Sequence, residues 1–433
     1  MKTLKTSRRP KQKKYSLRWL VGISAFSLGV AALFYVISTE RPAVSRAEIR
    51  RALYHSKLGN TLPATLNFTS LSRKKNLVAR ATYTIDRPFH ESIQTILHQY
   101  APDYAAFVAI EPKTGRILSL LSVQKPDIAI PSHLALRASF PSASIFKVIT
   151  AAAVISSRKA HSDTLIAYNG RPHTLYRSHV LKADENRYTQ RVSLREAFAK
   201  SINTVFGKLG VFFVGSDRLR EYADRFGFDE DLVSDVPVEM GRAHVSNNSW
   251  ELAETSSGFT NANTMSPLLG AVIAATVVND GARMVPYLVD SLHTEDGEEF
   301  YKGTPELATQ AIDKPTALEL RELMRATVDS GTSRVSFKGF QKGRILDLDV
   351  GGKTGSLTGY DPFGKYEWFV GYGDTGEKSI AIAAMVVSRK KWKVKASYLA
   401  RRALEIYFNK SLESRRAPIP TKDDPMIKRE RKS

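Results

Sequence analysis

The stretch at residues 105–123, AAFVAIEPKTGRILSLLSV, contains two apolar runs separated by Glu-Pro-Lys-Thr-Gly. Two such runs around a turn-forming segment are typical of a β-hairpin. Three successive strands are expected near the other end of the chain, in RILDLDVGGKTGSLTG (344–359), YEWFVGYG (366–373) and KSIAIAAMVVS (378–388). Segments with helical spacing of apolar residues, including 142–157 and 193–213, lie between the two groups. A sheet built from both ends of a domain, with helices between, predicts the α+β fold class.

Further helices are expected next to these strands. In residues 84–100 the apolar side chains recur at helical spacing after Asp86, whose side chain can cap the first turn. Residues 396–408 follow the last expected strand with a similar spacing. We therefore expect a single domain at residues 83–410.

The composition excludes several classes of protein. Of the 433 residues, 42% are hydrophobic and 25% charged, so the chain can bury a large core and is not disordered throughout. The absence of cysteine excludes disulfides, thiolate metal sites and cysteine nucleophiles. The net charge of +21 suggests an anionic partner, but much of the excess lies near the two ends of the chain. Nucleic acid is therefore not an expected partner.

The N-terminal region has the pattern of a membrane anchor. Residues 1–18 contain eight basic and no acidic residues, and residues 19–37, WLVGISAFSLGVAALFYVI, contain no charge. A helix of the latter length is about 28 Å long, close to the ~30 Å hydrocarbon layer of a membrane. The positive-inside rule then predicts a single-pass anchor in the cytoplasmic membrane, with the N-terminus in the cytoplasm and the remainder outside. A cleavable signal peptide is the alternative, although its apolar region usually has only about 7–15 residues.

Two further segments lack the pattern of a domain with its own core. Residues 38–82 are basic and weakly patterned, and we expect them to form a short stalk or pedestal. Residues 411–433 are rich in basic residues and contain three prolines, which predicts a disordered tail. Contact of this tail with anionic lipid or a wall polymer is the alternative to simple solvation.

Several types of catalytic and binding site have no support. The chain has no G-x-S-x-G motif for a hydrolase with a Ser-His-Asp triad and no H-E-x-x-H zinc motif. Gly352-Lys353-Thr354 resembles the end of a phosphate-binding loop, but Asp347 stands where that loop needs its first glycine. We expect neither a metal nor another cofactor.

A serine and a lysine one helical turn apart offer a different chemistry. Ser144 and Lys147 lie near the start of the apolar helix expected at residues 142–157, so that the i,i+3 spacing puts hydroxyl and amine on one face. An uncharged amine can take the hydroxyl proton, and burial near a second cation lowers a lysine pKa in that direction. The pattern S-x-x-K occurs five times, but only at Ser144 does it open a helix with buried character.

Two more segments carry polar residues that could act together with Ser144 and Lys147. Ser201 and Asn203 lie in the helix expected at residues 193–213 and offer a hydroxyl and an amide that can face the first pair. The expected strand at 344–359 carries a cation, two hydroxyls and a glycine that lets a substrate backbone approach. These four residues are Lys353, Thr354, Gly355 and Ser356. The order S-x-x-K, S-x-N, K-T-G is far more specific than any one member.

With these motifs the chain resembles the penicillin-binding proteins and the wider serine β-lactamase and transpeptidase superfamily. The resemblance covers roughly residues 83–408, including SASIFKVIT, KSIN, DSGTSR, VGGKTGS and EWFVGYG. It implies a β-lactamase/transpeptidase-like domain, in which helices flank an antiparallel sheet and form an additional helical subdomain. Ser142-Ala143 departs from the Pro-Gly that family members often have before the serine.

The resemblance also implies a role for each residue of the set. Ser144 corresponds to the acyl-enzyme nucleophile, Lys147 to its general base, Ser201 to a proton relay and Asn203 to the group that holds the substrate amide. Lys353, Thr354, Gly355 and Ser356 correspond to the binding site of the substrate carboxylate. The backbone N–H groups of Ser144 and Ser356 would form the oxyanion hole.

The function implied is that of a membrane-anchored peptidoglycan D,D-transpeptidase, which cross-links stem peptides through an acyl-serine and binds β-lactams covalently. The partners expected from it are stem peptides, β-lactams, the cytoplasmic membrane and a separate glycosyltransferase, because residues 38–82 are too few to polymerise glycan.

Three alternatives stay open. A D,D-carboxypeptidase uses the same residues but passes the acyl group to water. A β-lactamase needs a base that activates the deacylating water, and no segment of that type follows Ser201. A catalytically silent scaffold or sensor of cell-wall assembly would keep the fold without the reaction.

Overall fold

The protein is described here from a computed structural model, which describes residues 44–69, 76–125, 133–182, 185–340 and 348–408. The predicted basic segment 1–18, the anchor 19–37 and the tail 411–433 lie outside these ranges. In the part of the chain that is described, no helix is both long and apolar enough to cross a membrane.

The central element is a five-stranded antiparallel sheet with the strand order β14-β15-β16-β3-β4. The strands are β3 (Tyr104–Ile110), β4 (Ile117–Gln124), β14 (Asp349–Tyr360), β15 (Phe363–Asp374) and β16 (Ser379–Ser388). The hairpin and the three later strands expected from the sequence are thus present, and β16 pairs with β3 to join them, with Ala383 opposite Val108. β14 forms one edge of the sheet, and this edge carries the K-T-G motif.

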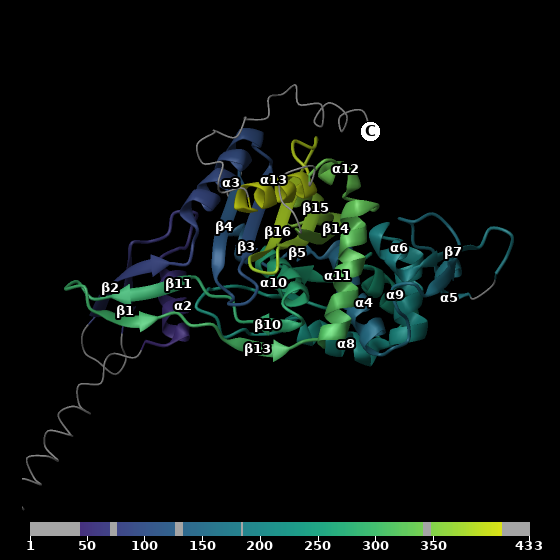
Figure 1. The fold of residues 1–433 in the computed structure, drawn as a ribbon, viewed down its shortest axis with the longest axis horizontal. Coiled ribbons are helices and arrows are strands. Elements are labelled where there is room, and N and C mark those ends of the chain that lie inside the picture. Colours follow the sequence, from purple (N-terminus) through teal and green to yellow (C-terminus); the bar gives the residue numbers. More distant parts are fainter. Residues whose placement is uncertain (1–43, 70–75, 126–132, 183–184, 341–347, 409–433) are drawn as a thin grey trace, which may run out of the picture. The chain divides into compact units, whose positions relative to one another are not determined.

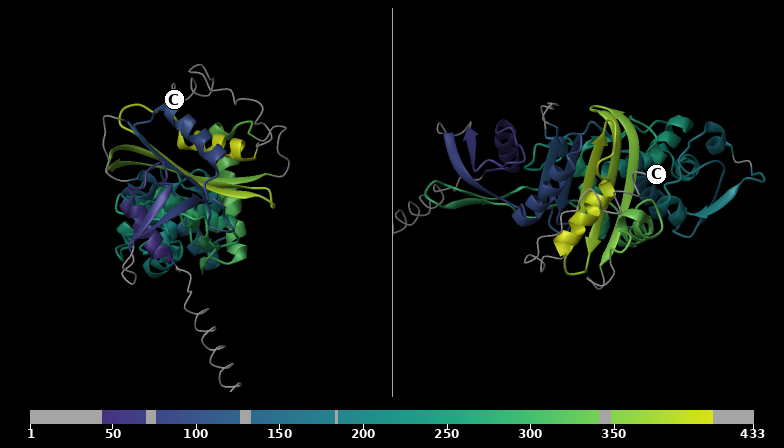
Figure 2. Two further views of the ribbon diagram at one scale, coloured as in Figure 1. Left: turned by 90° about the vertical axis from the view of Figure 1, so that its left-hand side faces the viewer. Right: turned by 90° about the horizontal axis from the view of Figure 1, so that it is seen from above.

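Helices cover both faces of this sheet (Figures 1 and 2). α3 (Arg87–Tyr100) and α13 (Ala396–Phe408) pack on one face, where their apolar residues share a buried core with alternate residues of the strands. α10 (Pro267–Val278), which is buried along its whole length, packs on the other face, and α11 (Lys314–Asp329) packs against β14. As predicted, the Asp86 side chain caps α3 by accepting a hydrogen bond from the Phe89 N–H.

The N-terminal part of the described chain shares a second sheet with later residues. Its order is β1-β2-β11-β12, with β1 (Thr65–Thr69), β2 (Asn76–Tyr83), β11 (Val289–His293) and β12 (Glu299–Lys302). α2 (Arg46–His55) precedes it and forms ion pairs from Arg46 to Glu306 and from Arg50 to Asp231. The boundary expected between residues 82 and 83 falls inside β2. The segment expected as a stalk therefore contains β1, which pairs with β2, and most of β2, which pairs with β11.

A helical region lies beside β14, at the right of Figure 1. Its helices are η2 (Ala143–Phe146, a 3₁₀ turn), α4 (Lys147–Ser156), α5 (Arg177–Leu181), α6 (Leu194–Ala199), α7 (Asn203–Lys208), η3 (Leu209–Val214, a π-helix), α8 (Ser216–Arg225) and α9 (Ser249–Ser257). The hairpin of β6 (Leu165–Tyr168) and β7 (Gln190–Ser193) projects from it.

The remaining described elements are short connections. They are η1 (Leu134–Leu136), β5 (Phe140–Pro141), β8 (Gly241–Arg242), β9 (Thr264–Met265), β10 (Ala282–Met284), β13 (Leu307–Gln310) and α12 (Arg334–Phe337). The strand β5 pairs with β9 directly before the Ser144 turn.

The helix expected at residues 193–213 is not continuous. It ends at Ala199 and restarts at Asn203, because Ser201 between them has a backbone φ of +56°, which a right-handed helix cannot contain. The apolar spacing of the sequence is compatible with one continuous helix and also with two separate helices, since α6 and α7 each bury an apolar face. The break places Ser201 at the end of one helix and Asn203 at the start of the next.

Candidate active site

The Ser144 turn connects β5 to the buried helix α4. Ser144 lies in the 3₁₀ turn η2, and Lys147 is the first residue of α4. Ala143 has a φ of +48°, in the left-handed region that favours glycine. The turn is followed by a helix that buries nine of its ten residues, so the hydroxyl projects from a rigid support.

Lys147 is fully buried, and its amine contacts three groups of the site. Nζ lies 2.8 Å from Ser144 Oγ and 2.7 Å from Asn203 Oδ1, and it donates a further hydrogen bond to the Ser257 carbonyl at the end of α9. Burial, and secondarily the nearby charge of Lys353, hold the pKa of Lys147 well below its usual range. The amine is thereby placed to exchange a proton with the Ser144 hydroxyl.

The break between α6 and α7 presents two polar side chains to this pair. Ser201 Oγ accepts a hydrogen bond from Lys353 Nζ at 2.9 Å. Asn203 contacts Lys147 through Oδ1, and its Nδ2 donates to the His173 carbonyl at 3.0 Å. Both side chains are buried, so the contacts fix their orientation.

Lys353 is the second fully buried cation of the site. It lies on β14 and donates to Ser201 Oγ and to the Thr354 carbonyl, each at 2.9 Å. Burial lowers the pKa of its amine to about 7. Hydrogen bonds thus connect Lys147 with Ser144 and Asn203, and Lys353 with Ser201. These residues come from the Ser144 turn with α4, the α6–α7 break and the edge strand β14.

The other three residues of the K-T-G motif follow Lys353 along the edge strand. Gly355 lies against the Ser144 turn, because a Cβ at this glycine would be 3.3 Å from the Ala143 Cβ and 3.4 Å from the Ser144 N. Thr354 is half-buried and Ser356 is exposed. The strand therefore offers two hydroxyls at a place where its backbone approaches the turn closely.

Sequence reasoning missed three contributors to this site. Thr332, in the loop after α11, has its Oγ1 2.6 Å from the Thr354 Oγ1. The Ser257 carbonyl contacts Lys147, and the His173 carbonyl contacts Asn203. The segment DSGTSR contains Thr332 and was part of the resemblance, but the two carbonyls leave no trace in the side-chain pattern.

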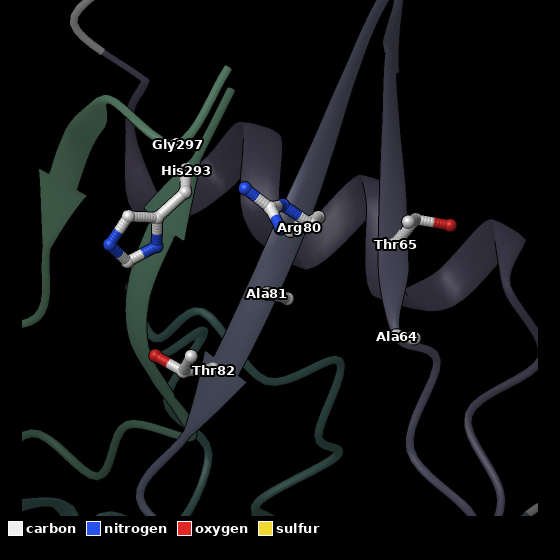
Figure 3. A pocket seen from close by; sticks show the side chains of 7 residues that line it. All are labelled: Ala64, Thr65, Arg80, Ala81, Thr82, His293 and Gly297. Atoms are coloured by element: carbon white, nitrogen blue, oxygen red, sulfur yellow. The ribbon is translucent and has the colours of Figure 1, made fainter. Parts of the chain in front are cut away.

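The described residues form no metal site, and a pocket among them lies apart from the predicted site residues. No group of three or more histidine, aspartate or glutamate side chains there lies close enough to hold a metal ion. A pocket between β1, β2 and β11 is lined in part by Thr65, Arg80 and His293, which Figure 3 shows at close range. None of the predicted site residues lines that pocket.

Sequence comparisons relate this chain to known proteins. Residues 105–406 match the penicillin binding protein transpeptidase domain. The chain is 31% identical to the peptidoglycan D,D-transpeptidase PbpA of Mycobacterium tuberculosis, and the match covers 66% of this chain and 62% of that protein. The chain thus spans less than two thirds of this relative's length.

Solved structures of two other proteins have a similar fold. The crystal structure of penicillin-binding protein A from M. tuberculosis is 27% identical with a TM-score of 0.62, and the match covers 76% of this chain and 82% of that one. The same mycobacterial protein has been solved as an imipenem acyl-enzyme complex. The D,D-transpeptidase domain of an Eggerthella lenta peptidoglycan glycosyltransferase shares the fold at 23% identity, with a TM-score of 0.64 and coverage of 86% and 92%. The chain therefore belongs to the penicillin-binding protein transpeptidase domain family.

Proposed function

We propose that this protein is a serine D,D-transpeptidase that cross-links peptidoglycan stem peptides through an acyl-enzyme on Ser144. The observation that carries the proposal is the buried Lys147 amine, whose pKa is lowered and which lies 2.8 Å from the Ser144 hydroxyl. An uncharged amine at that distance can act as the general base that a serine nucleophile needs. The named activity of the related mycobacterial PbpA supports the same reaction.

In the first step, Ser144 Oγ attacks the penultimate carbonyl of a D-Ala-D-Ala stem peptide while Lys147 accepts the hydroxyl proton. The C–N bond breaks, and the departing D-alanine amine receives a proton that passes from Lys147 through the Ser201 hydroxyl. Ser201 fits this relay because Lys353 donates a hydrogen bond to its Oγ and because Asn203, two residues later, contacts Lys147. In the second step an amine of a neighbouring stem peptide replaces the serine.

The substrate would be held on both sides of the nucleophile. Its terminal carboxylate fits the cation of Lys353 and the hydroxyls of Thr354 and Ser356 through charge-assisted hydrogen bonds. Asn203 retains an amide proton for a substrate carbonyl, and Gly355 keeps the strand close to the scissile bond. The N–H groups of Ser144 and Ser356 form the proposed oxyanion hole.

A β-lactam would acylate the same serine. Its strained amide imitates the scissile carbonyl, and its carboxylate fits the same strand residues. After ring opening the leaving amine stays tethered and blocks the acceptor, so the adduct persists. The imipenem acyl-enzyme of the M. tuberculosis relative supports this expectation.

We further propose that residues 19–37 anchor the protein in the cytoplasmic membrane with the transpeptidase domain outside. The basic flank and the uncharged apolar run carry this proposal. Because residues 38–82 are too few to form a glycosyltransferase domain, glycan polymerisation would come from a separate glycosyltransferase. A phosphatase fused after Phe408 should be active in intact cells, and an inactive fusion would contradict this orientation.

The test of the catalytic proposal is covalent labelling. The full chain is incubated with benzylpenicillin, its intact mass is measured over time, and the modified peptide is mapped. We expect a persistent adduct on residues 142–147 that is absent from Ser144→Ala. Rapid turnover of the drug would instead indicate a β-lactamase, and no adduct would indicate a silent scaffold. With a D-Ala-D-Ala donor, release of D-alanine that is indifferent to an added amine would indicate a carboxypeptidase.

A further inference from the structure

A short turn at residues 171–174 lies directly beside the candidate active site. Within it, Thr174 donates from N and Oγ1 to the Arg171 carbonyl at 3.3 and 3.0 Å. Asn203 holds the turn with two more hydrogen bonds, from its N to the Pro172 carbonyl at 2.7 Å and from Nδ2 to the His173 carbonyl at 3.0 Å. The turn is therefore fixed to the residue that also contacts Lys147.

His173 lies on this turn with its side chain exposed to solvent, and its backbone carbonyl binds the Asn203 that contacts Lys147. Its pKa is lowered, first by partial burial and then by the charges of Lys147 on α4 and Lys353 on β14, while a hydrogen bond with the Ser201 backbone acts in the opposite direction. These surroundings favour the uncharged form of the imidazole. It is an exposed titratable group beside the nucleophile, and the acylation chemistry above does not use it.

We propose that His173 is a further catalytic residue, which accepts a proton from the ammonium group of the acceptor peptide before that group attacks the acyl-enzyme. This proposal deepens the proposed transpeptidase function and rests on it. An acceptor amine of the lysine type has an ordinary pKa near 10.4, so it arrives almost wholly protonated at neutral pH. It must lose one proton to become a nucleophile.

The step balances as follows in atoms and charges. The acceptor ammonium gives one proton to the His173 imidazole, which becomes imidazolium and releases that proton to solvent. The uncharged amine nitrogen then forms a bond to the acyl carbon as the bond from that carbon to Ser144 Oγ breaks. The second proton of the attacking nitrogen passes through Lys147 to Ser144 Oγ, which restores the free enzyme.

The surroundings of His173 and Lys147 suit these two separate proton-transfer roles. Lys353, which is partly charged at neutral pH, also disfavours a bound ammonium nearby, so the acceptor releases its first proton more readily there than in water. Lys147 is fully buried and has no direct path to solvent, whereas His173 is exposed. Water needs no such deprotonation to approach the ester, so hydrolysis of the acyl-enzyme should be indifferent to His173.

The experiment compares wild type with His173→Gln, which keeps the backbone carbonyl that binds Asn203. A D-Ala-D-Ala donor peptide is supplied with one of two acceptors, Nα-acetyl-lysine amide, which is protonated at neutral pH, or hydroxylamine, which is not. The ratio of transfer to hydrolysis is measured for each. His161→Gln serves as the control, because His161 is an exposed histidine paired with Glu319 away from the site.

We expect His173→Gln to reduce transfer to the lysine-type amine about tenfold or more, within the range usual for a single acid–base group. Transfer to hydroxylamine and labelling by benzylpenicillin should stay within about twofold of wild type, and the control should match wild type with both acceptors. An equal loss with both amines would overturn the proposal in favour of a merely structural turn, and no loss would overturn it outright. Failure of wild type itself to be labelled by penicillin would contradict the transpeptidase function instead.

Discussion

At the scale of single residues, the site depends on two lysines that burial makes unusual. Each would cost several kcal/mol if it were buried with its full charge and without partners. The structure gives Lys147 three hydrogen-bond partners and Lys353 two, and it lowers both pKa values. The two amines nevertheless have different proposed tasks, because one must accept a proton while the other must bind an anion.

Replacing Lys147 with arginine should abolish acylation. A guanidinium keeps the positive charge but cannot act as a base near neutral pH. We expect the rate of labelling by benzylpenicillin to fall by about 10²- to 10⁴-fold, as for the loss of a general base. Stopped-flow or mass measurements of adduct formation would record it, with the exposed Lys159→Arg as the control. Retained acylation in Lys147→Arg would mean that this residue supplies only charge.

The pKa of Lys353 predicts how acylation depends on pH. Its amine is charged below about pH 7 and uncharged above it. The carboxylate of penicillin therefore loses its cation as the pH rises, and kcat/KM for acylation should decline above pH 7, by about tenfold per unit. Penicillin methyl ester has no carboxylate to bind, so its slower reaction should lack this decline. An identical decline for drug and ester would assign it to another group.

At the scale of elements, the end of α9 supports the Ser144 turn. Gly258 caps this helix with a φ of +66°, and a Cβ there would lie 1.9 Å from the Ala143 carbonyl oxygen. The preceding residue, Ser257, provides the carbonyl that contacts Lys147. A side chain at position 258 would therefore displace both the nucleophile turn and the base.

The prediction is that Gly258→Ala reduces acylation far more than it reduces stability. Gly376→Ala is a control, because Gly376 also has a positive φ, +84°, but a Cβ there would meet nothing within 4 Å. Both variants should lose about 1–2 kcal/mol of unfolding free energy from backbone strain, and Gly258→Ala should lose more because its Cβ also clashes with the Ala143 carbonyl. Only Gly258→Ala should also lose at least tenfold in the rate of penicillin labelling. Equal rates in both variants would show that the turn relaxes without cost.

At the scale of the whole molecule, the early strand β2 pairs with β11, which lies about 200 residues later in the chain. β2 pairs with β11 along its C-terminal half, where Ala81 faces Leu292 and Tyr83 faces Val289. Removing β2 would expose a buried strand edge, and such edges promote aggregation. A strand that lies mostly before residue 83 is therefore paired with one inside the expected domain.

This arrangement predicts different behaviour for two truncated chains. A chain that begins at Ser45 keeps α2, β1 and β2 and should be soluble and labelled by benzylpenicillin. A chain that begins at Tyr83 should aggregate or give less than about a tenth of the labelled soluble protein. Size-exclusion chromatography and mass measurement after labelling would compare them. Equal yields would mean that β11 and β12 are stable without their N-terminal partners.

The sequence by itself determined the central sheet and the chemical groups of the site. The strands have continuous or alternating apolar runs. The three motifs are local patterns whose spacing can be recognised without knowledge of the fold. Ser144 and Lys147 lie one turn apart, so even their contact follows from short-range geometry. The fold class and the identity of the proposed nucleophile needed no more than this.

Only the tertiary structure decided how the motifs meet and what surrounds them. The break at Ser201 depends on a positive φ that apolar periodicity does not encode, and it alone brings Ser201 to Lys353 across 152 positions of the chain. The contacts of Lys147 with Ser257 and of Asn203 with His173 use backbone carbonyls, which every residue has. The pairing of β2 with β11 likewise joins segments that are more than 200 residues apart. Such long-range backbone contacts have no local signature, because any sequence can supply the groups that make them.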